Sequence, residues 1–343
     1  MKVALFVNGW NAENVDNFID GFNEFFSNGD TDLFVFTSYS GSVESIERNE
    51  AEDSIYSLPD MSFFDAAIIF GSGIKDTNKI PQIIDRCKEA NVPVIVQGIN
   101  VDGVSTVTID NYIGMKKLCV HLIEKHGVKN AIYIAGTKDN EDSNFRLDVV
   151  KETFEEHGYS LPDENVIYAN WEANLIKEYI MGNFGDRKTK LPDAFICAND
   201  QMAMFVVLFL AQLGYKIPEN IIVSGFDNLS DGKVCYPSIA TVDQDYKKQG
   251  LECARLVSEL SHDKHKIIKS IIPCEYMPGE SCGCFECNDE TGFRKVVGRL
   301  WWSERYFSDN LQGRESHLDM CIMSNSKFED IHQSMNEDFL LTT

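Results

Sequence analysis

Short runs of apolar residues alternate along this chain with longer segments in which apolar residues recur at helical spacing. A run of about four to eight apolar residues between polar ones is typical of a strand buried on both faces of a parallel sheet. Val15, Phe18, Ile19 and Phe22 show the other pattern, because residues three or four apart lie on one face of a helix. The alternation therefore predicts strands connected by helices.

Two rounds of this alternation can be followed along the sequence. The first round predicts strands at Lys2 to Val7, Asp32 to Phe36, Ala66 to Phe70, Val94 to Gln97 and Val104 to Ile109, with helices at Asn14 to Phe26, Glu44 to Leu58 and Ile80 to Glu89. The second predicts strands at Ala131 to Ala135, Val166 to Ala169, Ala194 to Ala198 and Ile221 to Ser224, with helices at Ile113 to Lys125, Ser143 to His157, Glu172 to Met181 and Gln201 to Leu213. A helix at Tyr246 to Leu260 and a strand at Lys266 to Pro273 follow. Strands that alternate with helices indicate an α/β fold with doubly wound parallel sheets.

Polar side chains follow two of these strands directly. Asn199 and Asp200 come after the strand that ends at Ala198, and Asp227 comes after the strand that ends at Ser224. Open α/β folds bind their ligands at the carboxyl ends of their strands, so both positions are candidates for a site. Asn199 and Asp227 are equally typical of helix caps and turns, and taken alone they favour that simpler interpretation.

Several segments, taken in order, resemble the effector domain of the LacI/GalR repressor family. The ordered set is 64–69, 92–95, 107–111, Arg146, 196–203, 223–228 and 240–245. The resemblance extends from Lys2 to about Cys284. It implies a fold similar to type I periplasmic sugar-binding proteins, with two lobes and a ligand cleft between them.

The resemblance also implies domain boundaries. The first lobe would comprise residues 1–108 with 240–268, and the second 109–239 with 269–285. Residues 286–343 lie beyond the resemblance, and we expect them to form a helical extension or a linker to an output domain. Chain crossings are then expected near Ile109, Pro237 and Lys269, where a few residues could absorb a closing motion.

A polyol ligand needs acceptors, donors and flat apolar faces, and the resemblance assigns residues to these roles. The implied contacts of the second lobe and the hinge are Arg146, Trp171, Asn199, Phe226, Asp227 and Gln244, and those of the first lobe are Asn8 and Trp10. Other interpretations stay open, since Trp171 could be a core residue, Arg146 a surface charge and Asn8 a turn former. We expect no catalytic residues, no cofactor and no metal among them.

Two of the departures from the family pattern bear on function. Residues 97–100 contain no acid where many sugar-binding relatives carry an aspartate, which argues against a simple aldohexose or pentose. A family repressor would also begin with a helix-turn-helix, whereas this sequence opens on a predicted strand. With 31 basic against 54 acidic residues and a net charge of -23, we expect no direct binding to nucleic acid.

Location and function class follow from what the sequence contains. We expect a cytoplasmic protein without membrane contact, because the apolar start of the chain is cut short at Asn8 and Gly9 and no transmembrane-length run follows. A ligand-sensing regulatory module is the favoured function, and a solute-binding protein for transport is the alternative. An enzyme is disfavoured, since no phosphate-binding loop, nucleophile elbow or zinc-protease motif is found.

Three of the ten cysteines, Cys282, Cys284 and Cys287, lie within six residues of one another. A structural zinc site usually needs two separated pairs of ligands, and the neighbouring sequence offers no clear second pair. His262 and His265 lie upstream and His317 downstream at long spacing. We therefore expect no bound metal and interpret the other cysteines as reduced core residues.

The last part of the chain leaves the family pattern. Residues 292–343 contain apolar residues at helical spacing without strand character. This region resembles the connecting helices of sensor modules that precede diguanylate cyclase or other output domains. We expect a homodimer, and an output domain beyond this segment is a further possibility.

Overall fold

The computed structural model describes residues 1–9, 12–29, 31–41 and 46–286, and these residues form two compact units. The first unit contains residues 1–108 and 246–272, and the second contains 109–245 together with the segment from Pro273 to Glu286. Trp10 and the predicted C-terminal helix fall outside the described residues. Within the described part of the chain, no helix is long and apolar enough to cross a membrane.

The first unit is built on a six-stranded sheet with the order β11-β5-β4-β3-β1-β2. Its strands are β1 (Lys2–Asn8), β2 (Asp32–Ser38), β3 (Ala66–Phe70), β4 (Val94–Gln97), β5 (Ser105–Asp110) and β11 (Lys269–Pro273). The strand pairs from β2 through β5 are parallel, and Leu5 of β1 lies between Val35 and Ile68. Residues 3–7 are buried, which is why β1 reads as a continuous apolar run.

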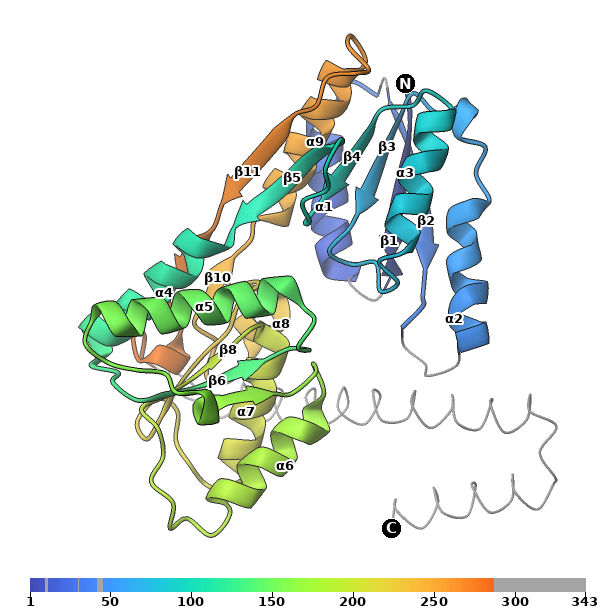
Figure 1. Cartoon of the computed structure of the whole chain (residues 1–343). Coiled ribbons are helices and arrows are strands. Elements are labelled where there is room, and N and C mark those ends of the chain that lie inside the picture. Colours follow the sequence, from blue (N-terminus) through green and yellow to red (C-terminus); the bar gives the residue numbers. More distant parts are fainter. Residues whose placement is uncertain (10–11, 30, 42–45, 287–343) are drawn as a thin grey trace, which may run out of the picture. The chain divides into compact units, whose positions relative to one another are not determined.

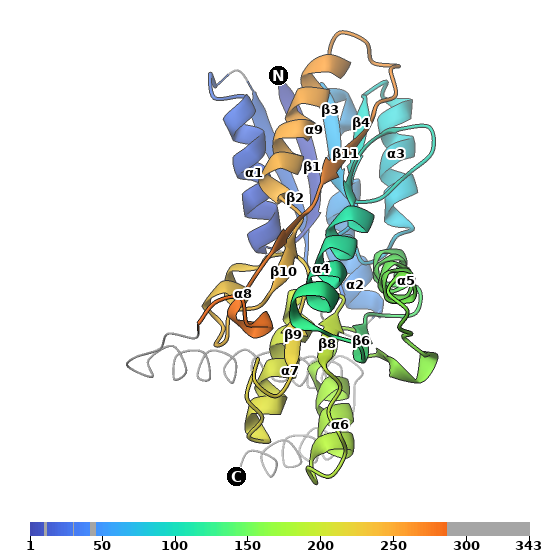
Figure 2. The same ribbon diagram turned by 90° about the vertical axis from the view of Figure 1, so that its left-hand side faces the viewer.

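Helices cover both faces of this sheet, as Figure 2 shows. They are α1 (Ala12–Phe25) and α9 (Tyr246–Leu260) on one face, and α2 (Ile46–Asp53) and α3 (Lys79–Glu89) on the other. Short 3-10 turns lie at η2 (Ser54–Ser57) and η3 (Met61–Phe63). Two glycines allow α1 and α9 to meet closely: a Cβ on Gly21 would lie 1.8 Å from the Lys247 carbonyl oxygen, and one on Gly250 would lie 1.9 Å from that of Phe18.

The second unit contains a four-stranded parallel sheet with the order β7-β6-β8-β9. Its strands are β6 (Ala131–Ala135), β7 (Val166–Tyr168), β8 (Ala194–Cys197) and β9 (Ile222–Ser224). In Figure 1 its helices lie on the two sides of the sheet. They are α4 (Asn111–His126) with α5 (Glu141–Glu156), and α6 (Ala173–Phe184) with α7 (Asp200–Gln212).

The remaining elements of the second unit are short. Strands β10 (Thr241–Asp243) and β12 (Glu275–Met277) form an antiparallel pair. The helix α8 (Ser230–Val234) and the 3-10 turns η4 (Asp163–Asn165) and η5 (Glu280–Cys282) complete it.

The α/β fold with two parallel sheets confirms the predicted fold class. Some elements differ from expectation: the predicted helix at Glu44 to Leu58 is α2 followed by the separate turn η2, and the predicted strand at Lys266 to Pro273 begins only at Lys269. Chain crossings lie at 108/109, 245/246 and 272/273. The second crossing comes after β10, at Tyr246 rather than near Pro237, because β10 pairs with β12 inside the second unit.

Candidate functional site

The carboxyl ends of β6, β8 and β9 lie at one edge of the second unit's sheet, because all three strands run in parallel. The segments that follow these strands carry most of the predicted ligand contacts. This is the edge at which open α/β sheets bind ligands. This edge is therefore the candidate site.

Arg146 lies on α5 and is buried, with 5% of its surface exposed. Its Nε donates to Asn111 Oδ1 at 3.0 Å, and its Nη1 donates to the Ala198 carbonyl oxygen at 2.7 Å. The guanidinium carbon lies 3.6 Å from the centre of the Phe226 ring. These contacts fix the guanidinium after the end of β8, so the surface-charge interpretation of Arg146 is wrong.

Asp227 faces Arg146 from the segment after β9. Its Oδ1 lies 4.0 Å from Arg146 Nη1 and accepts a hydrogen bond from Gln244 Nε2. The backbone N–H of Asp227 donates to the Val242 carbonyl oxygen at 2.9 Å, which ties this segment to β10 and so brings Gln244 to the carboxylate. Burial raises the pKa of Asp227 to about 6, although Arg146 and Gln244 act in the opposite direction.

Asn199 is the N-cap of α7, and its Oδ1 accepts from the Met202 backbone N–H at 2.9 Å. The interpretation of Asn199 as a helix cap is therefore correct for its side-chain oxygen. The amide nitrogen of the same side chain is the group that could contact a ligand. Phe226 is fully buried beneath the Arg146 guanidinium, so its present contact is with that arginine. Asn199 and Phe226 therefore both lie at this edge, and both hold a neighbouring group in place: Asn199 the start of α7, and Phe226 the Arg146 guanidinium.

Asp200, the first residue of α7, is fully buried and holds the segment after β9 in place. Its two carboxylate oxygens accept from the Thr241 hydroxyl at 2.6 Å and from the Leu229 backbone N–H at 2.9 Å. Burial, with a further contribution from the nearby Asp227, raises the pKa of Asp200 well above its ordinary value. Gly225 makes room for this carboxylate, because a Cβ there would lie 2.2 Å from Asp200 Oδ1.

Trp171 lies at the same edge. Its ring covers the backbone of Gly136, directly after β6, since a Cβ on Gly136 would lie 2.0 Å from the ring. Asn170 and Trp171 both have a positive φ, of 51° and 66°, which turns the chain between β7 and α6. Trp171 is half-buried at this edge, where its ring could stack on the apolar side of a ligand.

The first-unit candidates are Asn8 and Trp10. Asn8 is the last residue of β1, is fully buried, and donates from Nδ2 to the Ser40 carbonyl oxygen at 2.9 Å. Trp10 lies outside the described residues. Asn8 is therefore at the carboxyl edge of the first sheet, with its side chain engaged in its own unit.

The sequence did not single out two residues that complete the cluster, Asn111 and Asp142. Asn111 joins Arg146 to Asp142, because its Nδ2 donates to Asp142 Oδ1 at 2.8 Å while its Oδ1 accepts from Arg146. A signal was present: Asp110 ends the largely buried strand β5 and Asn111 follows it, much as Asn199 and Asp200 follow β8. Together these residues form a hydrogen-bonded network that ends at the opposed Arg146 and Asp227.

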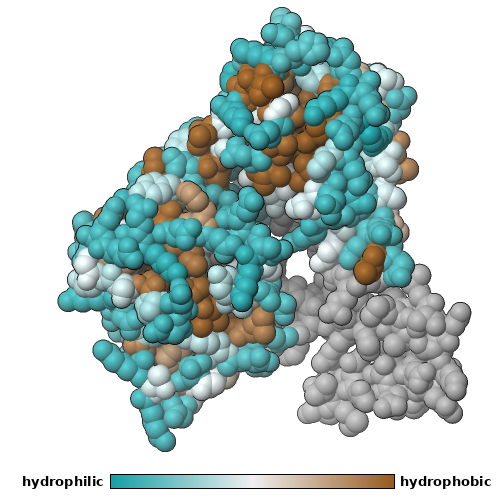
Figure 3. Space-filling model, viewed as in Figure 1, coloured by the Kyte–Doolittle hydropathy of each residue, from teal (hydrophilic) through white to brown (hydrophobic). Residues whose placement is uncertain are grey.

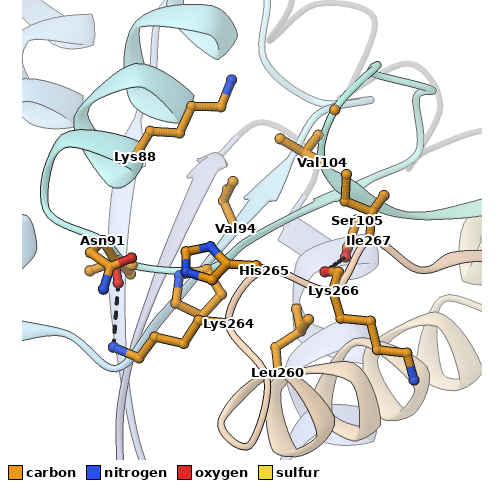
Figure 4. Close-up of a pocket in the computed structure, with 13 residues that line it drawn as sticks. Lys88, Asn91, Val94, Val104, Ser105, Leu260, Lys264, His265, Lys266 and Ile267 are labelled. Carbon is orange, nitrogen blue, oxygen red and sulfur yellow. Dashed lines mark hydrogen bonds between the residues drawn. The ribbon is translucent and has the colours of Figure 1, made fainter.

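A separate cavity of about 340 Å³ lies in the first unit and is drawn in Figure 4. Its lining includes the apolar Val94, Val104 and Leu260, and in Figure 3 hydrophobic residues gather on this face within a hydrophilic border. Lys264 crosses its rim to the Asn91 carbonyl oxygen at 3.3 Å. Because Val94 begins β4, this cavity lies at the amino end of the strand, opposite the edge that α/β folds use, and we do not assign the ligand to it.

Comparisons with known proteins agree with this architecture. Residues 120–282 match the periplasmic binding protein-like domain. Catabolite control protein A of Staphylococcus xylosus is 26% identical over 202 residues, which cover 58% of this chain and 58% of that protein. The HTH-type transcriptional regulator MalR of Clostridium butyricum is 27% identical over 208 residues, which cover 58% and 60%. The match thus spans less than two thirds of the length of either regulator.

Among solved structures, the complex of the transcriptional regulator CelR with cellobiose superposes with a TM-score of 0.67. The sequences are 22% identical, and the alignment covers 82% of this chain and 84% of CelR. At this identity the likeness shows a common fold.

Proposed function

The chain carries a periplasmic binding protein-like domain of the LacI-family effector type, and from this premise we propose that it is a ligand-sensing regulatory module. Its ligand would be a small polar molecule of carbohydrate type. The CelR structure, with cellobiose bound to the same fold, supports this class. The ligand would bind at the carboxyl edge of the second unit's sheet and signal by closure of the two lobes.

The observation that carries the proposal is the opposed pair Arg146 and Asp227. A guanidinium can only donate, and a carboxylate can only accept, so a hydroxyl group placed between them can accept from one and donate to the other. The 4.0 Å separation of Nη1 and Oδ1 is longer than a hydrogen bond, so the two groups do not satisfy each other directly. A sugar hydroxyl between them would add one hydrogen bond to each group.

Three further residues extend the proposed contacts. Gln244 and the amide nitrogen of Asn199 add neutral hydrogen-bonding groups next to the charged pair, and the Trp171 ring offers an apolar face. Phe226 supports Arg146 from below. Asn8 and Trp10 are proposed as the contacts of the first lobe, which would join the site when the lobes close.

The decisive variant is Asp227→Asn, which removes the negative charge and keeps the shape. Asparagine tolerates the φ of 111° that Asp227 adopts, so the variant should fold. A panel of monosaccharides, disaccharides, polyols and nucleosides would first be screened by thermal shift. Calorimetry should then show that Asp227→Asn weakens binding of the carbohydrate found by about 1.5–3 kcal/mol, because a hydrogen bond to a charged group is lost.

Asp163→Asn is the matched control, since Asp163 is exposed on the same unit and, among the residues that the structure describes, its carboxylate pairs with Lys151 alone. Its affinity should equal that of the wild type. A carbohydrate that binds Asp227→Asn as tightly as the wild type would rule out this site. A ligand found only among the nucleosides would rule out the proposed ligand class.

A further inference from the structure

Four potential metal ligands from distant parts of the chain converge in the second unit. His121 and His126 belong to α4, with His126 as its last residue, and Cys282 and Cys284 lie at and just after η5. One ligand atom from each of the four lies within 4.8 Å of all the others. Three are closer still: His121 Nε2 lies 3.1 Å from His126 Nε2 and 3.1 Å from Cys284 Sγ, and His126 Nε2 lies 3.4 Å from Cys284 Sγ.

The local chain geometry explains how two cysteines only two residues apart can reach one point. Gly283 between them has a φ of 86°, a left-handed conformation that favours glycine, and it caps η5. On the other side of the cluster, α4 is capped by Gly127, which is also left-handed with a φ of 71°. Both segments therefore turn sharply at the cluster.

Hydrogen bonds among these groups cannot account for all of the short contacts. Each imidazole Nε2 has one directed position, which is either a lone pair or an N–H. Here each Nε2 meets two partners, the other imidazole and the Cys284 sulfur. A cation at the centre could use the lone pair of every ligand at once.

The distances also match a coordination sphere. With zinc–ligand bonds of about 2.0–2.3 Å in tetrahedral geometry, ligand atoms lie about 3.3–3.8 Å apart. The three short contacts fall near this range, and Cys282 Sγ lies within 4.8 Å of the other three ligand atoms. Two sulfur and two nitrogen ligands in a tetrahedral set are characteristic of zinc.

We propose that His121, His126, Cys282 and Cys284 form a structural zinc site that fastens the segment after β12 to α4. Four protein ligands close the coordination sphere, so the site would be structural rather than catalytic. Binding would release the thiol protons to solvent and leave two thiolates on the ion. Tyr276 would support the site, because its ring packs on His121 at 4.6 Å and its hydroxyl lies 3.5 Å from Cys282 Sγ.

The zinc site does not depend on the proposed function. It replaces the expectation from the sequence that the chain binds no metal. The missing second ligand pair is present, but it lies 158 and 163 residues before Cys284 in the chain. Cys287, the third cysteine of the sequence cluster, lies outside the described residues and is not needed to complete the set.

The proposal is tested by measuring the zinc content and the Zn²⁺ affinity of the full chain, purified with reductant and without chelator. Elemental analysis should find about one Zn²⁺ per chain, because the four proposed ligands together hold one ion. Removal of the ion by a chelator should lower the melting temperature, and Zn²⁺ alone should restore it, because an ion that binds only the folded state stabilises that state. His121→Ala and Cys284→Ser should each weaken Zn²⁺ binding by more than about 100-fold, beyond the loss typical of an outer-shell partner.

Two controls carry the same substitutions outside the set. His262→Ala, at an exposed position in the first unit, and Cys287→Ser should both retain full affinity. Loss of binding in either control would overturn the assignment of ligands.

Co²⁺ provides a readout that needs no variant. The wild-type chain loaded with Co²⁺ should show the intense absorption of tetrahedral coordination together with thiolate-to-metal charge transfer. A weak octahedral spectrum, or reduced wild-type protein that binds neither Zn²⁺ nor Co²⁺ at micromolar concentrations, would overturn the proposal.

Discussion

Asp227 is held in a backbone conformation that few aspartates adopt, with a φ of 111°. Residues in such regions persist only where their surroundings fix them, and they are frequent at functional sites. Here the backbone N–H bonds to Val242, the carboxylate bonds to Gln244, and Arg146 lies opposite. A carboxylate that is buried, strained and only partly paired is disfavoured in its charged form.

This leads to a prediction for the pH dependence of stability. Burial raises the pKa of Asp227 from its ordinary 3.8 to about 6, so the folded state takes up a proton at a pH where the unfolded chain is still ionised. The stability that this proton uptake adds is fully present below the pKa of Asp227 in the unfolded chain, and it is lost as the pH rises through about 6. Urea unfolding should therefore show wild type gaining stability relative to Asp227→Asn between pH 7 and pH 5.

Asp163→Asn serves as the control, because the pKa of Asp163 is shifted in the direction opposite to that of Asp227. The hydrogen bond from Lys151 lowers the pKa of Asp163. The stability that this carboxylate contributes is therefore lost only when the pH falls below the ordinary carboxyl pKa. The stability difference between wild type and Asp163→Asn should stay constant from pH 7 to pH 5. If the stability difference between wild type and Asp227→Asn were equally constant over this pH range, the pKa of Asp227 would not be raised in the folded state.

At the level of elements, the packing of α1 on α9 depends on glycines that let the two backbones touch. Gly21 and Gly250 face carbonyl oxygens of the opposite helix, which cannot move as the end of a side chain can. Elsewhere α7 and the segment after β9 are joined through Asp200, and Gly225 leaves room for it. In both places a position without a side chain decides how closely two elements approach.

We expect Gly250→Ala to destabilise the protein by about 1–3 kcal/mol, because the added methyl group overlaps the Phe18 carbonyl and forces the helices apart. Denaturant unfolding measures this change directly. Gly182→Ala, in α6, is the matched control, since nothing lies within 4 Å of its Cβ position. That variant should be stabilised by up to about 1 kcal/mol, because alanine is a better helix former than glycine. Equal effects of both substitutions would contradict the close approach of α1 and α9.

At the level of the whole molecule, the chain passes between the two units at three points, namely 108/109, 245/246 and 272/273. Three short connections can act together as a hinge, because a few residues at the ends of elements absorb a change of angle. A ligand shifts such an equilibrium only by its different affinities for the open and closed states.

The expected outcome is closure on binding. Solution X-ray scattering should show that a saturating carbohydrate ligand reduces the radius of gyration of the wild-type chain. Asp227→Asn at the same ligand concentration should keep the value of the free protein, because binding is weakened. An unchanged radius of gyration in ligand-saturated wild type would argue for a binding domain that does not signal by lobe closure.

Local patterns in the sequence determined the order and type of most elements, because a strand buried on both faces requires an uninterrupted apolar run. They also located the candidate edge, since polar residues such as Asn199 and Asp227 directly follow such runs. They did not reveal β10 and β12, because these short strands contain Thr241, Asp243 and Glu275 and so form no uninterrupted apolar run.

The partners of the functional side chains were decided only by the tertiary structure. Arg146 gains its neighbours from Asn111, Ala198 and Phe226, and Cys284 meets His121 and His126 from α4. These contacts join residues far apart in the chain, and no local spacing encodes them. They arise when packing of the helices and sheets brings the segments together, which is why the sequence showed half of the proposed zinc site and the fold supplied the other half.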